Sequence, residues 1–431
     1  MRDGPHRTET RLDWDRFVRL HWDRHPVVFR DIGPPVYPAD AVLRAVARAR
    51  PRDDDDVPTL RFVLDGRQLA APGPWLPDPH DIDFDAYARR VRERAGDACE
   101  YALIVNTLHR HGYGVWAAGQ RFFQGLWQRV GIPGSSAITT LFHGNYERTP
   151  VGVHKDRFAT FLFVLEGRKR MRFWPQRPWS APVATCVDYA EYVGSSFAID
   201  VEPGDVLYWP ADYYHVGETA GVGQATSVNV GVPRHEHRLA YDLDAVLPLA
   251  PEACKDAFRP EPASMFASER TMLPEAMRQA LQATRAEFEI QRLAAGARRW
   301  RLQLATAGGF VPPPPLVTAA PAAATGNAHR CAGDRTGRSA IGESSVGGGP
   351  DRDGECRHLR LRDDATPLVW DRDEAGPGGL CAAGGHVRRF EDGTEIGRLV
   401  DRLNAGGRVA VEDLPDLRDW LLATRIVRRV A

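Results

Sequence analysis

Three side chains in this sequence could bind one metal ion. His154 and Asp156 are two residues apart, and His215 follows far downstream, after a segment that begins at Gly204. Two imidazoles and one carboxylate can occupy one face of an Fe(II) ion and leave its other coordination positions open for a co-substrate and oxygen. The sequence therefore indicates redox chemistry at a non-haem iron.

The spacing of His154 and Asp156 suits an extended backbone. Side chains at positions i and i+2 of a strand project to the same face, so both could reach one ion. The neighbouring residues favour a strand or discourage a helix, namely Pro150, Val151, Gly152, Val153 and Phe158. We therefore expect an extended segment here.

A second His-x-Asp pair, His21 and Asp23, is interpreted differently. It lies at the end of residues 14–22, whose apolar positions follow the period of a helix. On a helix, side chains two apart point about 200° away from each other. We expect these two residues to lie at the surface or in packing contacts.

Two further clusters could be read as metal sites. His109 and His111, together with His143, resemble the opening of a cupin-type site, but no carboxylate follows at a suitable spacing and the nearby glycines indicate a loop. The run Asp53–Asp56 is most simply a solvated loop.

Lys169 stands out in the segment after Asp156. Residues 158–165 and 168–174 read as two strands joined at Glu166 and Gly167. The second strand alternates between three arginines on one face and Lys169, Met171 and Phe173 on the other. A buried ammonium is costly unless an anion meets it, so Lys169 predicts an anion site, although the lysine could instead reach water from the strand end.

These motifs resemble the JmjC-type 2-oxoglutarate oxygenases, and among them the cupin-like protein hydroxylases that include the bacterial ribosomal oxygenases. The resemblance rests on Val153-His154-x-Asp156, on Gly167-Arg168-Lys169-Arg170, and on the run from Gly204 to Pro210 before His215. It spans roughly residues 100–235.

The resemblance implies a specific site. His154, Asp156 and His215 would be the Fe(II) ligands, with 2-oxoglutarate and O2 as co-substrates. Lys169 would bind the distal carboxylate of 2-oxoglutarate, because it occupies the family's anion-binding position, fifteen residues after the first ligand. The implied reaction converts 2-oxoglutarate to succinate and hydroxylates a C–H bond.

Other pocket residues follow less directly. Asn229 resembles a polar residue that the family carries near the co-substrate, but it could equally point outward from its strand. Val151 replaces a threonine that binds the co-substrate in some relatives, so another group would have to supply that contact. The candidates are Thr160, Asn106 and Tyr101, with Thr140 as a further pocket residue.

We expect a mainly β protein with α-helices, built on a double-stranded β-helix, the cupin-like jelly roll. A helix is predicted over residues 120–130, before the barrel. The predicted parts are an N-terminal α/β extension packing on the barrel (1–98), the catalytic jelly roll (99–240), a helical region (251–305), a linker rich in Pro, Ala and Gly (306–350), and a winged-helix-like domain (351–431).

Composition limits the partners. The 431 residues have a formal charge of -1 and a pI near 6.9, which gives no general attraction to nucleic acid or to an anionic membrane. The amino end lacks the apolar core of a signal peptide, and no apolar run approaches the roughly twenty residues of a membrane span. Six dispersed cysteines indicate neither disulfides nor zinc. We therefore expect a cytoplasmic protein.

The expected function is hydroxylation of an amino-acid side chain in a ribosomal protein or a ribosomally synthesised precursor peptide. The alternatives are oxidation of a small metabolite and a non-catalytic, metal-binding regulator. The helical region 251–305 could mediate a homodimer, as in the family, or simply cover the barrel. The acidic residues of the winged-helix-like domain disfavour DNA binding, so we expect a docking or structural role.

Overall fold

The computed structural model describes residues 6–49, 59–220, 223–234, 282, 290–316, 358–374, 376–410 and 412–431. These residues form two compact units. The first comprises residues up to Pro313 together with Gly384–Arg388, and the second comprises Pro314–Ala383 and Arg389–Ala431. In the described part of the chain, no helix is both long and apolar enough to span a membrane.

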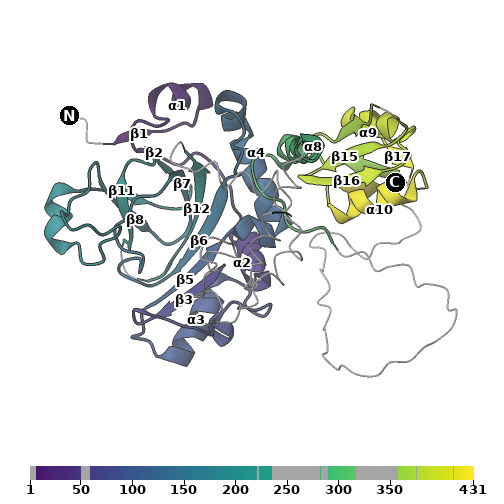
Figure 1. Ribbon diagram of the computed structural model, residues 1–431. Helices are drawn as coiled ribbons and strands as arrows, with labels where there is room; N and C mark the ends of the chain where they lie inside the picture. Colours follow the sequence, from purple (N-terminus) through teal and green to yellow (C-terminus); the bar gives the residue numbers. More distant parts are fainter. Residues whose placement is uncertain are drawn as a thin grey trace, which may run out of the picture. The chain divides into compact units, whose positions relative to one another are not determined.

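A nine-stranded sheet forms the centre of the first unit (Figure 1). Its order is β1-β2-β10-β7-β12-β6-β5-β3-β4. The pair β1–β2 is parallel and the other pairs are antiparallel. The strands are β1 (Arg7–Glu9), β2 (Val27–Phe29), β3 (Leu60–Leu64), β4 (Arg67–Gln68), β5 (Tyr101–Asn106), β6 (Ile138–Gly144), β7 (Phe158–Glu166), β10 (Val206–Trp209) and β12 (Ala225–Pro233).

The N-terminal region takes part in this sheet. Strands β1 and β2 extend one end of it, and β3 and β4 form the other end. The first 98 residues therefore contribute strands as well as packing on the sheet, because pairing satisfies backbone groups that β10 and β5 would otherwise leave exposed at an edge.

A three-stranded sheet packs against the large one. Its order is β11 (Tyr214–Thr219), β8 (Lys169–Trp174) and β9 (Phe197–Val201). One buried cluster joins the two sheets, with Leu162 and Trp209 from the large sheet and Met171, Phe173 and Ile199 from the small sheet. This part of the chain is thus a mixed α/β fold with two packed sheets, and the connectivity of a jelly roll stays a prediction.

The two predicted strands β7 and β8 are present, but they do not pair with each other, because β7 belongs to the large sheet and β8 to the small one. β7 ends at Glu166 and β8 begins at Lys169, with Gly167 at a positive φ of 70° between them. In β8 the alternation is as expected, because Lys169, Met171 and Phe173 are buried while Arg170 and Arg172 are half-buried. These two arginines pair with carboxylates on the neighbouring strands, Asp200 and Glu218.

Helices cover the face of the large sheet that points away from the small one. Helices α1 (Trp14–Leu20) and α4 (Tyr113–Val130) pack there through aromatic side chains, and the ring of Phe161 lies 6.2 Å from Trp14 and 5.1 Å from Phe123. Helix α4 begins at Tyr113, before the predicted residue 120. Inside it, Gly119 allows the close approach of Tyr37 and Phe310, which an added Cβ would meet at 3.1 and 3.2 Å. The other helices of this region are α2 (Ala39–Arg48), α3 (Phe84–Ala95), and the short 3₁₀ turns η1 (Gly73–Trp75), η2 (Leu108–His111) and η3 (Ala190–Ser195).

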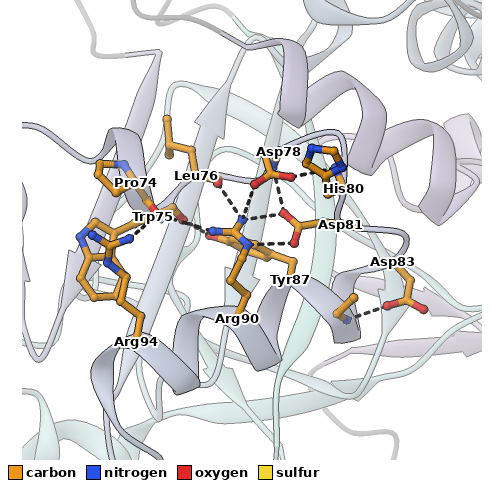
Figure 2. A network of polar contacts seen from close by, with 11 residues as sticks. Pro74, Trp75, Leu76, Asp78, His80, Asp81, Asp83, Tyr87, Arg90 and Arg94 are labelled. Carbon is orange, nitrogen blue, oxygen red and sulfur yellow. Dashed lines mark hydrogen bonds and ion pairs between the residues drawn. The ribbon is translucent and has the colours of Figure 1, made fainter.

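A polar network ties helix α3 to the loop before it. Figure 2 shows Arg90 reaching from α3 to the Asp81 carboxylate, to which it donates two hydrogen bonds of 3.0 and 2.6 Å. Tyr87 donates to the carbonyl of Trp75 at 2.7 Å, and the Trp75 ring stacks on Phe62 of β3 at 5.7 Å. The network therefore supports strand β3 from the helix side.

Residues at the start of the predicted linker are packed. Helix α8 (Ile290–Ala307) continues past residue 305, and Thr306 and Phe310 are fully buried. The Trp116 indole donates to the Phe310 carbonyl at 3.3 Å, which attaches this segment to α4. Most of the predicted helical region 251–305 and the linker beyond residue 316 lie outside the described residues.

The second unit holds two small sheets, ordered β17-β13-β18 and β14-β15-β16. The division between the units falls within strand β16 (His386–Phe390), after Arg388. The other elements are β13 (His358–Leu361), β14 (Val369–Arg372), β15 (Gly379–Ala383), α9 (Ile396–Asn404), β17 (Val409–Ala410), α10 (Pro415–Ala423) and β18 (Val427–Val430). The winged-helix interpretation of this unit stays a prediction.

Candidate metal centre and its pocket

Backbone pairing brings the two separated histidines together. His154 and His215 face each other in an antiparallel bridge, with N–O distances of 3.1 and 2.8 Å in the two directions. Two residues that exchange both backbone hydrogen bonds place their side chains on the same side of the pair. The expected strand through Asp156 is absent, because only isolated bridges occur at Val153 and His154, yet the Asp156 carboxylate still lies beside both rings.

The three side chains present one compact donor set. Asp156 Oδ1 lies 3.5 Å from His154 Nε2, and Asp156 Oδ2 lies 3.5 Å from His215 Nε2. One ligand atom from each residue lies within 4.8 Å of the other two. Within the described ranges, no other three His, Cys, Asp or Glu side chains converge in this way.

Hydrogen bonds orient both imidazoles for metal binding. His154 Nδ1 lies 3.0 Å from the Gly152 carbonyl, and His215 Nδ1 lies 3.2 Å from the Tyr213 carbonyl. A carbonyl only accepts, so each Nδ1 carries a proton. Each Nε2 therefore faces Asp156, where it can donate to the carboxylate when it is protonated or bind a metal when it is not. The residues therefore fit a divalent ion such as Fe(II), which would bind the carboxylate and the two Nε2 atoms in their unprotonated form.

The charges of the site agree with this donor set. Burial opposes ionisation of Asp156, but hydrogen bonds from both histidines outweigh it and hold the pKa of the carboxyl far below its usual range. Burial lowers the pKa of His215, and the adjacent His154 lowers it further. For His154, burial is outweighed by the bond to Asp156, so its pKa is raised. An anionic Asp156 is what a cation requires.

The donor set opens into a cavity of about 570 Å³. Its wall includes the three candidate ligands, Lys169, and side chains of both sheets. Among the apolar lining residues are Ile104, Ile138, Phe142, Phe158, Leu162 and Met171. This volume is in the range of small-molecule sites, about 300–1,000 Å³.

A polar row crosses the large sheet inside this cavity. Asn229 of β12 pairs with Thr140 of β6, which pairs with Asn106 of β5. All three line the pocket, and Thr160 of β7 lines it as well. Asn229 therefore points inward, which decides between the two orientations that its strand allowed. Its Oδ1 is buried and has no hydrogen-bond partner among the described residues.

Tyr101 does not line the pocket. It lies on β5 five residues before Asn106, and since side chains alternate along a strand, the two must project from opposite faces. Its hydroxyl lies 3.0 Å from His143 Nε2, and its ring stacks on Phe62 beneath helix α3. The expectation that Tyr101 contacts the co-substrate is therefore corrected.

Lys169 lies in the pocket without an acidic partner. It is 2% exposed, forms no ion pair with a carboxylate in the described part of the chain, and donates a hydrogen bond to the Tyr146 hydroxyl. Its ammonium lies 4.2 Å from the centre of the Tyr146 ring. Burial lowers the pKa of Lys169 to about 7.

Sequence reasoning missed Tyr146 and Arg61, which also line the cavity. Tyr146 follows β6 in a loop, and nothing in the local pattern distinguishes it. Arg61 lies between Leu60 and Phe62, where a single basic residue on a strand ordinarily faces water. Only the pairing of β3 with β5 brings Arg61 to the pocket.

The other histidine clusters have structural contacts. His21 Nδ1 lies 3.1 Å from His25 Nε2 at the end of α1, whereas the Asp23 carboxylate accepts a hydrogen bond from Arg234. His109 and His143 are buried, and each binds a threonine hydroxyl at 2.8 Å through Nδ1. None of them joins a three-residue ligand set among the described residues.

Comparison with known proteins identifies one domain. Residues 119–238 match the family model of the JmjC domain, a range that contains the three candidate ligands and Lys169. No curated protein matches the chain significantly.

Several solved structures resemble the chain at low identity. An X-ray structure of E. coli ycfD has 15% identity and a TM-score of 0.44, covering 97% of this chain and 98% of that one. A crystal structure of the E. coli ribosomal oxygenase YcfD gives 14% and 0.45, with coverage of 97% and 98%. The same enzyme with cobalt and 2-oxoglutarate gives 15% and 0.43, with coverage of 97% and 99%.

Proposed function

We propose that this chain, a JmjC-domain oxygenase dependent on Fe(II) and 2-oxoglutarate, hydroxylates an amino-acid side chain of a peptide or protein. The observation that carries the proposal is the meeting of two features in one cavity. Two imidazoles and an anionic carboxylate converge there, and a buried lysine without a carboxylate partner in the described residues lies in the same wall. The first feature suits iron and the second suits a dicarboxylate.

Each residue of the site has a defined part. His154, Asp156 and His215 would hold the iron, which when bound supplies the oxidising chemistry that turns 2-oxoglutarate and O2 into succinate, CO2 and a hydroxylated substrate. Lys169 and Tyr146 would bind the distal carboxylate of 2-oxoglutarate and orient it. The apolar side chains of the cavity exclude water from the reacting C–H bond.

The cavity also has room for part of a substrate beside 2-oxoglutarate. Its volume of about 570 Å³ leaves room beside a five-carbon co-substrate for the side chain of a substrate. Thr149 Oγ1, Ser227 Oγ and Asn229 Oδ1 are buried there without partners in the described ranges. A peptide carries the N–H donors that such atoms lack. The motif resemblance to protein hydroxylases favours the same substrate class.

The test is succinate formation that depends on an added peptide. Candidate ribosomal proteins and precursor peptides would be incubated with Fe(II), 2-oxoglutarate and O2, and mass spectrometry would detect the gain of one oxygen atom. We expect His154→Ala and Asp156→Ala each to abolish both signals, because each removes a ligand. His80→Ala, at an exposed histidine outside the pocket, is the matched control and should keep full activity.

Other outcomes would select the alternatives. Substrate-dependent succinate formation with a metabolite and with none of the peptides would indicate a small-molecule oxygenase. Metal and partner binding with no succinate under any condition would indicate a regulator, and would end the proposal of catalysis.

A further inference from the structure

We propose that Arg61 binds a carboxylate of the substrate, so that the protein selects peptides with an acidic residue or a free carboxyl terminus at the pocket. The inference rests on the proposed function, because it assigns the substrate class of the same cavity. The starting observation is that Arg61 is a second cationic side chain in the cavity wall, besides Lys169. Neither the metal site nor the co-substrate would neutralise its charge.

Arg61 lies in a different part of the cavity wall from Lys169. It pairs with Ile104 of β5, which pairs with Phe142 of β6, which pairs with Ser227 of β12. All four line the cavity. Strands are about 4.8 Å apart, so Arg61 starts from a backbone position about 14 Å across the sheet from Ser227. Lys169 belongs to the small sheet.

The guanidinium of Arg61 has no partner in the described part of the chain. Its Nε is buried and unbonded, and the side chain forms neither a hydrogen bond nor an ion pair with any described residue. Other half-buried arginines of this unit do have carboxylate partners. Arg90 pairs with Asp81 at 2.6 Å, and Arg172 pairs with Glu218 at 2.8 Å.

An unpaired arginine in a pocket wall requires an anion from elsewhere. Arginine cannot lose its proton in a protein, whereas Lys169 can relieve its burial by becoming neutral. A cation left partly desolvated without a partner is costly. Strand β3 is also held in place, because Phe62 stacks on Trp75 and Trp75 is tied to α3 through Tyr87 (Figure 2). Arg61 is thus presented to the cavity by a supported strand.

The charges of the site indicate which ligand supplies this anion. The carboxylate among the lining residues is Asp156, which is engaged by both histidines. A ferrous ion with Asp156, and protonated Lys169 with the 2-oxoglutarate dianion, together sum to zero. The charge of Arg61 remains. The planar guanidinium matches a carboxylate with two parallel hydrogen bonds, and in an unmodified peptide the anions are carboxylates.

Binding of peptide pools tests the proposal without turnover. Four acetylated, amidated pools would carry a fixed central Asp, Asn, Glu or Gln between two randomised positions on each side. Two more pools, with a central Ala, would end in a free carboxylate or in an amide. Retention by the protein with Fe(II) and 2-oxoglutarate, under anaerobic conditions, would be measured by mass spectrometry. The two sets separate a side-chain carboxylate from a terminal one.

In wild-type protein we expect one acidic pool to bind about 10- to 100-fold better than its neutral counterpart, as for a hydrogen-bonded charge pair. Arg61→Gln should remove this preference, and Arg61→Lys should keep part of it. The affinity for 2-oxoglutarate should stay unchanged in both variants. It is measured from the visible charge-transfer band of 2-oxoglutarate chelated to Fe(II). Arg67→Gln, at an exposed arginine on the adjacent β4, should behave as wild type.

Three results would overturn the proposal. The first is equal binding of acidic and neutral pools to the wild-type protein, which includes the case that neither pool binds. The second is an acidic preference that survives in Arg61→Gln. The third is loss of 2-oxoglutarate affinity in Arg61→Gln, which would make Arg61 a co-substrate residue. Acid-dependent binding without any gain of oxygen would contradict hydroxylation and leave the role of Arg61 standing.

Discussion

At the scale of the residue, Lys169 is a buried cation that has no carboxylate partner among the described residues. The lysine is 2% exposed, and in the described part of the chain its contacts with Tyr146 are a hydroxyl and a ring rather than a carboxylate. Its charge is therefore poorly compensated until an anion binds. The same burial that makes the ammonium costly makes its attraction for a carboxylate strong, because little water competes.

This environment predicts a pH dependence of 2-oxoglutarate binding. The pKa of Lys169 is lowered to about 7, and only the protonated form attracts the dianion. As pH rises from 7 to 9, the charged fraction of the free protein falls, so affinity for 2-oxoglutarate should fall by up to about tenfold per pH unit. Titration of the charge-transfer band at several pH values would measure this.

Lys169→Met is the decisive comparison for that pH dependence. It removes the charge from a buried position while keeping a long apolar side chain, so affinity should be low and nearly independent of pH between 7 and 9. Arg168→Met, at the exposed neighbouring arginine, should retain the wild-type profile. A wild-type slope in Lys169→Met would show that another group titrates.

At the scale of the element, the β7–β8 connection joins the large sheet, which carries the pocket residue Thr160, to the small sheet, which carries Lys169. Its turn requires Gly167, which has a φ of 70° and whose added Cβ would lie 2.3 Å from the Gln224 carbonyl oxygen. The neighbouring strand therefore crosses where a side chain would stand. Glycine here serves both the turn and the close approach of another backbone.

Gly167→Ala should consequently destabilise the protein more than the same change in an open turn. Gly66, between β3 and β4, has a φ of 75° and nothing within 4 Å of an added Cβ. Gly66→Ala should cost about 1–2 kcal/mol for the left-handed backbone alone. Gly167→Ala should cost at least about 1 kcal/mol more, as in overpacked sites. Urea unfolding would measure both, and equal losses would contradict the role of the Gln224 contact.

At the scale of the whole molecule, the described residues of the site belong to the first unit. The candidate ligands, Lys169 and Arg61 all lie between residues 61 and 215. The second unit has its own buried side chains, including Leu417 and Leu421 of α10. The chemistry should therefore tolerate damage to the second unit.

Leu421→Ala tests that separation. Leu421 is 1% exposed, and truncation of a buried leucine costs about 2–5 kcal/mol. Calorimetry should show a lowered unfolding temperature for the second unit, while the charge-transfer titration should give an unchanged affinity for 2-oxoglutarate. A tenfold loss of that affinity would show that the units are energetically coupled.

The sequence alone determined the features that depend on local periodicity. The two-residue spacing of His154 and Asp156 is a feature of the sequence itself. The break between β7 and β8 follows from Gly167, and the inward position of Lys169 follows from alternation along β8. The same rule, applied within β5, would have separated Tyr101 from Asn106.

Only the tertiary structure decided which distant strands become neighbours. The pairing of β3 with β5 carries Arg61 into the cavity, and the loop after β6 brings Tyr146 to Lys169. The meeting of His154 with His215 likewise depends on one bridge between segments far apart in the chain. Alternation is a property of each strand's own backbone, whereas strand order results from long-range burial and hydrogen bonding, which no short stretch of sequence specifies.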